Sequence, residues 1–141
     1  MTTIIEVSDD LQTVLQLVTQ RVDVGSNWRA TGFIGEGINA PVLKVARDAF
    51  DPRYVFGQSK AEHTFTVTAY VNRSAGESGE RDLAALCELS GNGSVIARIQ
   101  TGANWSVTVD HAQVVNVGKV EPVEVGGAEY LALPFQVKVV W

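Results

Sequence analysis

The clearest hydrophobic pattern in the sequence is an alternation at its C-terminal end. Every second residue is apolar in the set Leu131, Leu133, Phe135, Val137, Val139 and Trp141. A period of two predicts a β-strand with one buried face. We therefore expect this face to pack in the core, with Trp141 anchoring the sheet. Pro134 lies inside this strand and lacks an amide donor, so we expect it at an edge or a bulge.

A second alternating segment precedes this strand, and a tight turn separates the two. The turn is Val125-Gly126-Gly127-Ala128, in which the two glycines supply the positive φ angles that a tight hairpin needs. The preceding segment carries apolar residues at alternate positions from about Trp105 to Val123. The pattern predicts a long C-terminal hairpin with arms at about 105–123 and 124–141.

A third alternating segment, His63–Asn72, lies in the middle of the chain. Its apolar positions are Phe65, Val67, Ala69 and Val71, and threonines and Tyr70 occupy the positions between them. Threonine and tyrosine suit the open face of a sheet. The segment therefore predicts a strand with one buried face.

Helical periodicity occurs in two regions. Ser8 precedes an amphipathic pattern made of Leu11, Val14, Leu15, Val18 and Val22. Ser8 can cap this helix, with Asp9 and Asp10 in its first turn. After a polar loop at 73–79, a helix beginning at Ser78 or Gly79 and a short helix capped by Ser94 are expected to form a pair; their apolar residues are Leu83, Leu86, Cys87, Val95, Ile96 and Ile99.

The segment from about 24 to 62 has little regular pattern, because glycines and prolines interrupt it. Short strands are expected at 29–34 and 42–46, within a long irregular loop region of the kind that is often functional or ordered by a partner. The order of the elements predicts an α+β fold. We expect an antiparallel sheet of about four strands, with the N-terminal helix and the helix pair packed on one face.

Composition narrows the class of protein. The chain has 141 residues, which suits a single domain spanning 1–141. Its net charge is -5, with no basic cluster, which argues against a surface built to grip phosphates. No apolar run approaches the roughly 20 residues that span a bilayer, and the N-terminus lacks the pattern of a signal peptide, so we expect an intracellular protein at synthesis.

Candidate catalytic residues are few. Asp110 and His111 are adjacent, but neighbours on a strand point to opposite faces, so they are not expected to form a dyad. His111 falls at a position on the apolar face, where a satisfied core or rim histidine is the favoured interpretation. His63 has no metal-ligand spacing with another residue, and the single cysteine, Cys87, fits a small buried hydrophobe better than a nucleophile.

Partial motifs also favour ordinary structure. Gly35-Glu36-Gly37 is half of a dinucleotide fingerprint with no helix expected after it. The run Ser90–Ser94 resembles a phosphate-binding loop, but no Lys-Ser/Thr follows it, so a linker between helices is favoured. The acidic residues Glu77, Glu80, Asp82 and Glu88 fit a solvated helix face. We therefore predict no catalytic, cofactor-binding or metal-binding residues, no cofactor, and no enzymatic activity.

Three stretches resemble the tail terminator, or tail completion, proteins of long-tailed bacteriophages, especially those of actinobacterial hosts. The first is His63–Arg73, which is similar to the family's central strand and polar loop. The second combines Arg81–Leu86 with Gly93–Ala97, which is similar to its helix pair. The third is Val117–Val139, in which Val125-Gly-Gly-Ala-Glu-Tyr-Leu131 is similar to a turn common in the family. The resemblance covers roughly residues 8 to 140.

The resemblance implies a structural virion protein at the head-proximal end of the tail, assembled in the host cytoplasm. Family members form a homo-oligomeric ring, usually a hexamer, that ends polymerisation of the tail tube. The implied partners are the tail tube protein and a stopper or neck protein of the head–tail connector. Genomic DNA would pass through the lumen without sequence-specific binding, and no membrane would be involved.

Two alternatives remain open at this point. One is a head–tail stopper or adaptor protein of the neck, which would be similar in size and also without chemistry. The other is a small ligand-binding or hydrolytic α+β domain that uses Asp110, His111, His63 and Cys87.

Overall fold

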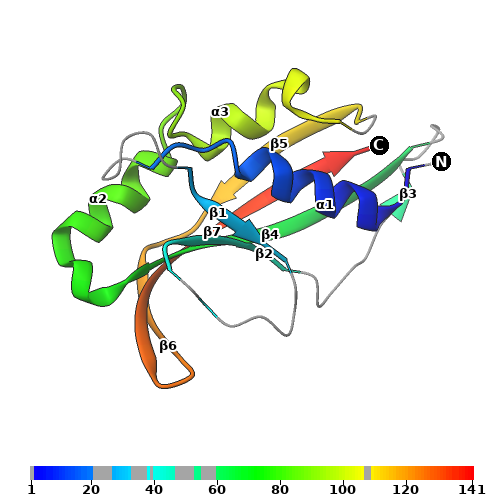
Figure 1. Cartoon of the computed structure of the whole chain (residues 1–141). Helices are drawn as coiled ribbons and strands as arrows, with labels where there is room; N and C mark the ends of the chain where they lie inside the picture. The colour runs from blue at the N-terminus through cyan, green and yellow to red at the C-terminus, as the bar shows by residue number, and fades with distance from the viewer. Residues whose placement is uncertain are drawn as a thin grey trace.

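The protein is an α+β domain in which helices cover a mixed sheet, as a computed structural model shows (Figure 1). The structure describes residues 2–20, 27–32, 38, 40–46, 53–54, 60–106 and 109–141. The helices are α1 (Ile4–Leu15), α2 (Gly76–Leu86) and α3 (Val95–Gln100), with 3-10 turns η1 (Arg73–Ala75) and η2 (Gly102–Asn104). The strands are β1 (Arg29–Thr31), β2 (Val42–Val45), β3 (Arg53–Tyr54), β4 (Ala61–Asn72), β5 (His111–Val117), β6 (Glu121–Val125) and β7 (Ala128–Val140). The predicted fold class is confirmed.

Within the described part of the chain, the sheet has seven strands rather than about four. Its order is β1-β2-β4-β7-β5, with β3 also beside β4 and β6 also beside β7. Every pair is antiparallel except β1 with β2, so the prediction of a purely antiparallel sheet is wrong. The short strands expected at 29–34 and 42–46 are present as β1 and β2. The additional strands are β3, whose two residues carry no readable alternation, and the second of the two strands, β5 and β6, into which the first arm of the hairpin is divided.

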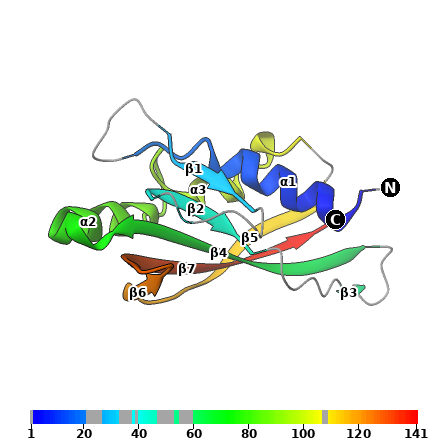
Figure 2. The same ribbon diagram turned by 60° about the horizontal axis from the view of Figure 1, so that its bottom comes forward.

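The long pair β4 and β7 forms the spine of the sheet. Eleven residue pairs join them, from Glu62 with Val140 to Asn72 with Tyr130. Both strands alternate as predicted, since the apolar side chains on one face of each strand are buried. Their exposure is at most 4% in β4 and at most 8% in β7. These residues are Phe65, Val67, Ala69, Val71, Leu131, Leu133, Phe135, Val137 and Val139. All three helices pack on this apolar face (Figures 1 and 2).

Helix α1 begins earlier than predicted. Thr3 caps it: the Glu6 amide donates to Thr3 Oγ1 at 3.3 Å, and the Thr3 amide donates to Glu6 Oε2 at 3.2 Å. This is a capping box, a Thr-x-x-Glu signal that precedes the Ser8 candidate. Ser8 is therefore buried inside the helix, and Asp10 lies beyond the first turn, where its Oδ2 accepts the Ser106 amide at 2.8 Å.

The predicted inner stripe of α1 is confirmed as far as the structure describes it. Leu11, Val14, Leu15 and Val18 are fully buried, although the helix ends at Leu15. Val22 lies outside the described residues.

The predicted pair of helices is confirmed, although the first of them begins earlier than expected. Helix α2 begins at Gly76, two or three residues before the predicted start, after the short η1 turn replaces part of the expected loop. Gly76 has φ +58°, a value that glycine tolerates without steric cost, so it can turn the chain from η1 into α2. Ser94 caps α3 as predicted, because its Oγ accepts the Ala97 amide at 3.0 Å.

The predicted hairpin exists, but its first arm is divided. Strands β5 and β6 pair with different halves of β7 and are separated at residues 118–120. Trp105 lies outside the arm, at the end of η2, where its indole Nε1 donates to the Ile99 carbonyl at 2.9 Å. The pairing with β7 shifts by one residue between Val114 and Asn116, which marks a bulge.

Pro134 explains where the first arm is divided. It lies in β7, which has neighbours on both sides, so it is not on an edge strand. Its carbonyl accepts the Gly118 amide at 2.8 Å, so the position that lacks a donor faces the break between β5 and β6. A Cβ on Gly118 would come within 2.5 Å of the Pro134 ring, so this close approach requires glycine.

The side chain of Trp141 packs within its own chain. Its amide and carbonyl pair with those of Ala61 at 2.8 and 2.7 Å, and its indole Nε1 donates to the Thr2 carbonyl at 3.2 Å. The side chain is half-buried and packs against the core. The predicted anchoring role is confirmed.

Candidate functional site

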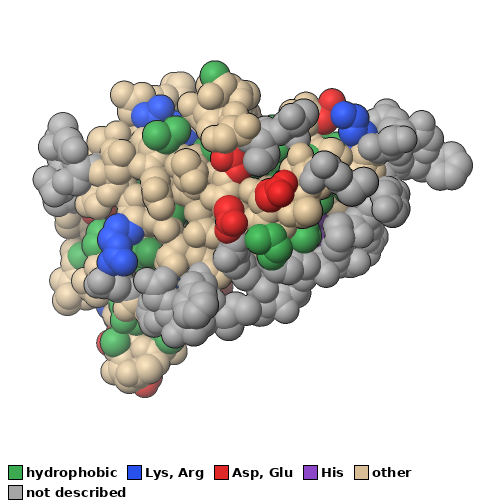
Figure 3. Space-filling model, turned by 45° about the vertical axis from the view of Figure 1, so that its right-hand side comes forward, with side chains coloured by type: hydrophobic (Ala, Val, Ile, Leu, Met, Phe, Trp, Pro, Cys, Tyr) green, Lys and Arg blue, Asp and Glu red, His purple; other side chains and the backbone are tan. Residues whose placement is uncertain are grey.

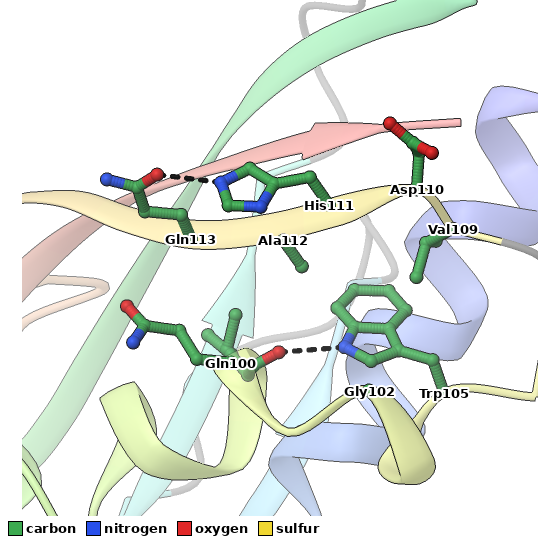
Figure 4. Close-up of a pocket in the computed structure, with 9 residues that line it drawn as sticks. Gln100, Gly102, Trp105, Val109, Asp110, His111, Ala112 and Gln113 are labelled. Atoms are coloured by element: carbon green, nitrogen blue, oxygen red, sulfur yellow. Dashed lines mark hydrogen bonds between the residues drawn. The ribbon is translucent and has the colours of Figure 1, made fainter.

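A pocket of about 400 Å³ lies between α3 and β5, and two of the four candidate catalytic residues, Asp110 and His111, line it (Figure 4). Ile99, Gln100 and Gly102 line it from the helical side, with Trp105 next to them. The strand side supplies Val109, Asp110, His111, Ala112 and Gln113. The edge position of β5 leaves room for this hollow, because no further strand among the described residues lies beside it.

Three polar side chains of this pocket, those of Asp110, His111 and Gln113, have partners. His111 Nε2 lies 2.7 Å from Gln113 Oε1, and Figure 4 shows the imidazole turned toward that amide. Asp110 projects elsewhere, and its Oδ1 lies 3.7 Å from Lys60 Nζ. Asp110 and His111 are therefore not arranged as a dyad, in agreement with the sequence argument.

The expected environment of His111 is wrong. The residue is exposed, on the face of β5 opposite the helices, whereas Ala112 and Val114 pack against the core. The alternation read back from Val115 and Val117 placed His111 on the apolar face. The bulge at Val115 shifts the phase by one residue, so positions before it face the other way.

Cys87 has the environment of an inert thiol. It follows the last residue of α2, is half-buried, and its Sγ donates to the Leu83 carbonyl at 3.7 Å. Burial raises the pKa of the thiol, and the negative charge of Glu88 raises that pKa further. A nucleophilic cysteine needs the opposite shift.

His63 is also set apart from the pocket. It lies in β4, is 8% exposed, and packs edge-on against Phe65 with ring centroids 4.6 Å apart. The fold therefore distributes His63, Cys87 and His111 over three elements, and only Asp110 and His111 line a common pocket.

The structure shows the role of those partial motifs that lie in its described residues. Ser94 ends the Ser90–Ser94 run as a helix cap, which fits a linker between α2 and α3. Gly35-Glu36-Gly37 lies outside the described residues. Glu77, Glu80 and Glu88 are exposed, and Asp82 is half-buried. Within the described ranges, no group of three or more histidine, cysteine or acidic residues is placed to hold a metal ion.

The second unusual surface is the end of the hairpin, which we call the arm and define as Lys119–Tyr130. Figure 1 shows it extending beyond the helices, at the bottom of the view. Among the described residues, five large hydrophobic side chains are exposed, and two of them, Val120 at 40% and Val125 at 43%, lie in the arm. A third, Val115 at 47%, lies just before it at the bulge. Alternation identified the strands but could not reveal that this part of the sheet lacks a helical cover.

Among the described helices, none is long and apolar enough to cross a membrane. The chain matches no known protein-family model and no curated protein.

Proposed function

We propose that this chain is a structural subunit of a phage tail terminator, which forms a ring at the head-proximal end of the tail tube and ends its polymerisation. The observation that carries the proposal is the arm, a projecting hairpin whose Val120 and Val125 side chains remain exposed. Exposed apolar side chains on a projecting element are typical of an assembly surface. The arm also contains residues 125–130 of the Val125–Leu131 stretch, on which the resemblance to the family depends most.

The arrangement of the remaining residues supports a role without catalysis. The imidazole of His111 is engaged with Gln113, and the thiol of Cys87 has a raised pKa. Recognition in a ring needs only complementary surfaces on neighbouring subunits. The net charge of -5 fits a channel through which DNA passes without being held, because like charges repel.

Native mass spectrometry of the purified chain, with and without tail tube protein, tests the proposal. We expect a closed oligomer, usually of six copies in this family, that associates with the ends of tubes and prevents their growth. A chain that stays monomeric and never associates with tube or neck proteins would contradict it.

A stopper or adaptor of the neck is the main rival within the same class of assemblies. Cryo-electron microscopy of intact virions distinguishes the two. Density for this chain directly above the last tube ring supports a terminator, whereas density against the portal, separated from the tube by another ring, supports the rival.

A further inference from the structure

Strand β5 has an edge that no described strand covers, because it is the last strand in the order β1-β2-β4-β7-β5. Trp141 exchanges both main-chain bonds with the first residue of β4, so the odd-numbered residues of β7 face β4 and the even-numbered ones face β5. His111 and Gln113 lie opposite even-numbered residues, so their main-chain groups point to β7. The N–H and C=O groups of Ala112 and Val114 therefore point away from β7, at the open edge of the sheet.

The open edge of β5 lacks the residues that discourage strand pairing. Its sequence, His-Ala-Gln-Val-Val-Asn-Val, has no proline and no lysine, arginine or acidic residue. In the arm, Pro122 and Glu124 lie opposite odd-numbered residues of β7, so they direct their main-chain groups outward, and Figure 3 shows acidic atoms at the tip of this projection, at the lower left. Proline offers no N–H there, and edge charges oppose burial against a second strand. Of these two edges, β5 is therefore the one suited to accepting a strand.

The bulge at Val115 limits how much of this edge a second strand can use. Before the bulge, only Ala112 and Val114 direct their main-chain groups outward, because Asp110 already donates its N–H to a carbonyl of β7 at 2.8 Å. Past the bulge, the strand changes phase. An antiparallel partner must match two outward residues that are two positions apart, and β5 of a second copy does so. Ala112 of each copy then lies opposite Val114 of the other, and Gln113 lies opposite Gln113.

The side chains of β5 also match in this self-pairing. On the helix side, Val114 of each copy would lie beside Ala112 of the other, at the border of the pocket that Ala112 lines (Figure 4). On the other side, Val115, which is 47% exposed, would lie opposite His111 of the second copy. Each copy carries a net charge of -5, but no like charges face each other along this strand. The uncharged edge is thus a place where two acidic copies can meet.

We propose that two copies of this chain pair through β5, antiparallel about a two-fold axis at Gln113, and so join their sheets edge to edge. Each pair of Ala112 with Val114 would exchange two main-chain hydrogen bonds. The contact is isologous and closes at a dimer, so it differs from the heterologous contacts of a ring and does not rest on the proposed function. One short strand from each copy makes a small interface, so the dimer is weak and depends on concentration.

Disulfide trapping tests the position of the axis. In a Cys87→Ser background, Gln113→Cys places two thiols opposite each other in a non-hydrogen-bonded pair, with Cα atoms about 4.5 Å apart, which suits a disulfide. Asn116→Cys is the matched control, because it is also exposed on β5 but its two copies would be roughly 20 Å apart in this register. In a glutathione buffer, we expect a covalent dimer of the first variant and little of the second. Equal yields from the two variants would overturn the register.

A charge test uses the same position. Gln113→Lys and Gln113→Glu should each raise the dissociation constant of the dimer, about two-fold to five-fold, because like charges would face each other. An equimolar mixture of the two variants should recover the loss, which a structural effect of either substitution would not produce. Sedimentation velocity measures association, and circular dichroism confirms that each variant is folded. A mixture that associates no better than either variant alone would contradict the proposed axis.

The remaining outcomes separate this contact from other surfaces and from the proposed function. A wild-type chain that forms no dimer even at millimolar concentration would overturn the self-pairing and leave the edge to a segment of another protein. Dimerisation that both charge variants leave unchanged would place the contact elsewhere, which also overturns it. A chain that associates with tube ends without the Gln113→Cys cross-link keeps the terminator role and loses this contact, and the reverse result keeps the contact alone.

Discussion

The body of the sheet and the arm share one long strand, β7, whose two ends lie in different environments. In the body, Phe135, Val137 and Val139 are completely buried beneath the helices. In the arm, Ala128 and Glu129 are exposed, and the opposing strand β6 packs chiefly on β7. The difference teaches that alternation in the sequence marks strands, whereas the placement of the helices decides which part of a strand is core. We therefore expect the body to determine stability and the arm to contribute little to it.

Removal of the last five residues, 137–141, is the most severe test of the body. It deletes two buried valines and the main-chain pairing of Trp141 with Ala61. We expect insoluble or unfolded protein, because the strand end joins β4 and β5 over the core. Solubility and circular dichroism measure the outcome. A soluble truncated chain with a native spectrum would show that this end of β7 is dispensable.

A pair of alanine substitutions compares the two regions at the level of a single side chain. Phe135→Ala leaves a cavity in the core and should lower the free energy of unfolding by about 3–5 kcal/mol. Val125→Ala, in the arm, should change it by no more than about 0.5 kcal/mol. Urea denaturation followed by fluorescence measures both. Similar losses for the two variants would remove the distinction between body and arm.

The turn offers a way to loosen the arm alone. Gly126 and Gly127 have φ angles of +60° and +82°, so Gly126→Val should cost about 1–2 kcal/mol of local stability. Because this cost is confined to the arm, hydrogen exchange should quicken at Val123 and Tyr130 and stay unchanged at Phe65 and Val137. Faster exchange throughout β4 and β7 would mean that the arm and the body open together.

The smallest expected effect is on the pH dependence of stability, and it comes from the thiol of Cys87 in the body. Since burial raises its pKa, the folded chain holds the thiol proton more tightly than the unfolded chain does. That contribution to stability is complete below the ordinary thiol pKa and is lost as the pH rises through the raised value. Cys87→Ser should remove this alkaline decline.

The same shift predicts slow alkylation of Cys87. At pH 8, iodoacetamide should react more slowly with the folded chain than with the chain in urea. Rapid alkylation of the folded chain would favour the hydrolytic alternative.

The elements with a long, regular pattern were predictable. The buried faces of β4 and β7 follow from alternation, and the inner stripe of α1 follows from helical periodicity, whereas the eleven residue pairs that join the two strands do not follow from either pattern. The local signal Thr3-x-x-Glu6 is also sufficient to set the start of α1. Pro134, which was expected at an edge or a bulge, coincides with the division of the first arm. Strand β3 was different, because its pairing is set by the rest of the sheet rather than by its own two residues.

The candidate site was less predictable than the fold. A single bulged residue, Val115, reversed the expected direction of His111, and sequence periodicity does not reveal a bulge. The pocket beside β5 depends on η2 and Trp105, which are brought there by the Trp105–Ile99 hydrogen bond. The exposure of Val120 and Val125 is a property of the assembled sheet. Val125 lies on the face of Tyr130, opposite the face of Leu131 that packs in the core.

The continuity of β7 also has a mechanical consequence. The arm and the core are one uninterrupted strand, and β4 runs antiparallel beside it for eleven residue pairs. A pull along the arm therefore acts parallel to β7 and loads these hydrogen bonds together in shear, instead of peeling them apart one after another. The molecule resists extension most strongly along this axis, whereas a force across the sheet would detach the short outer strands first.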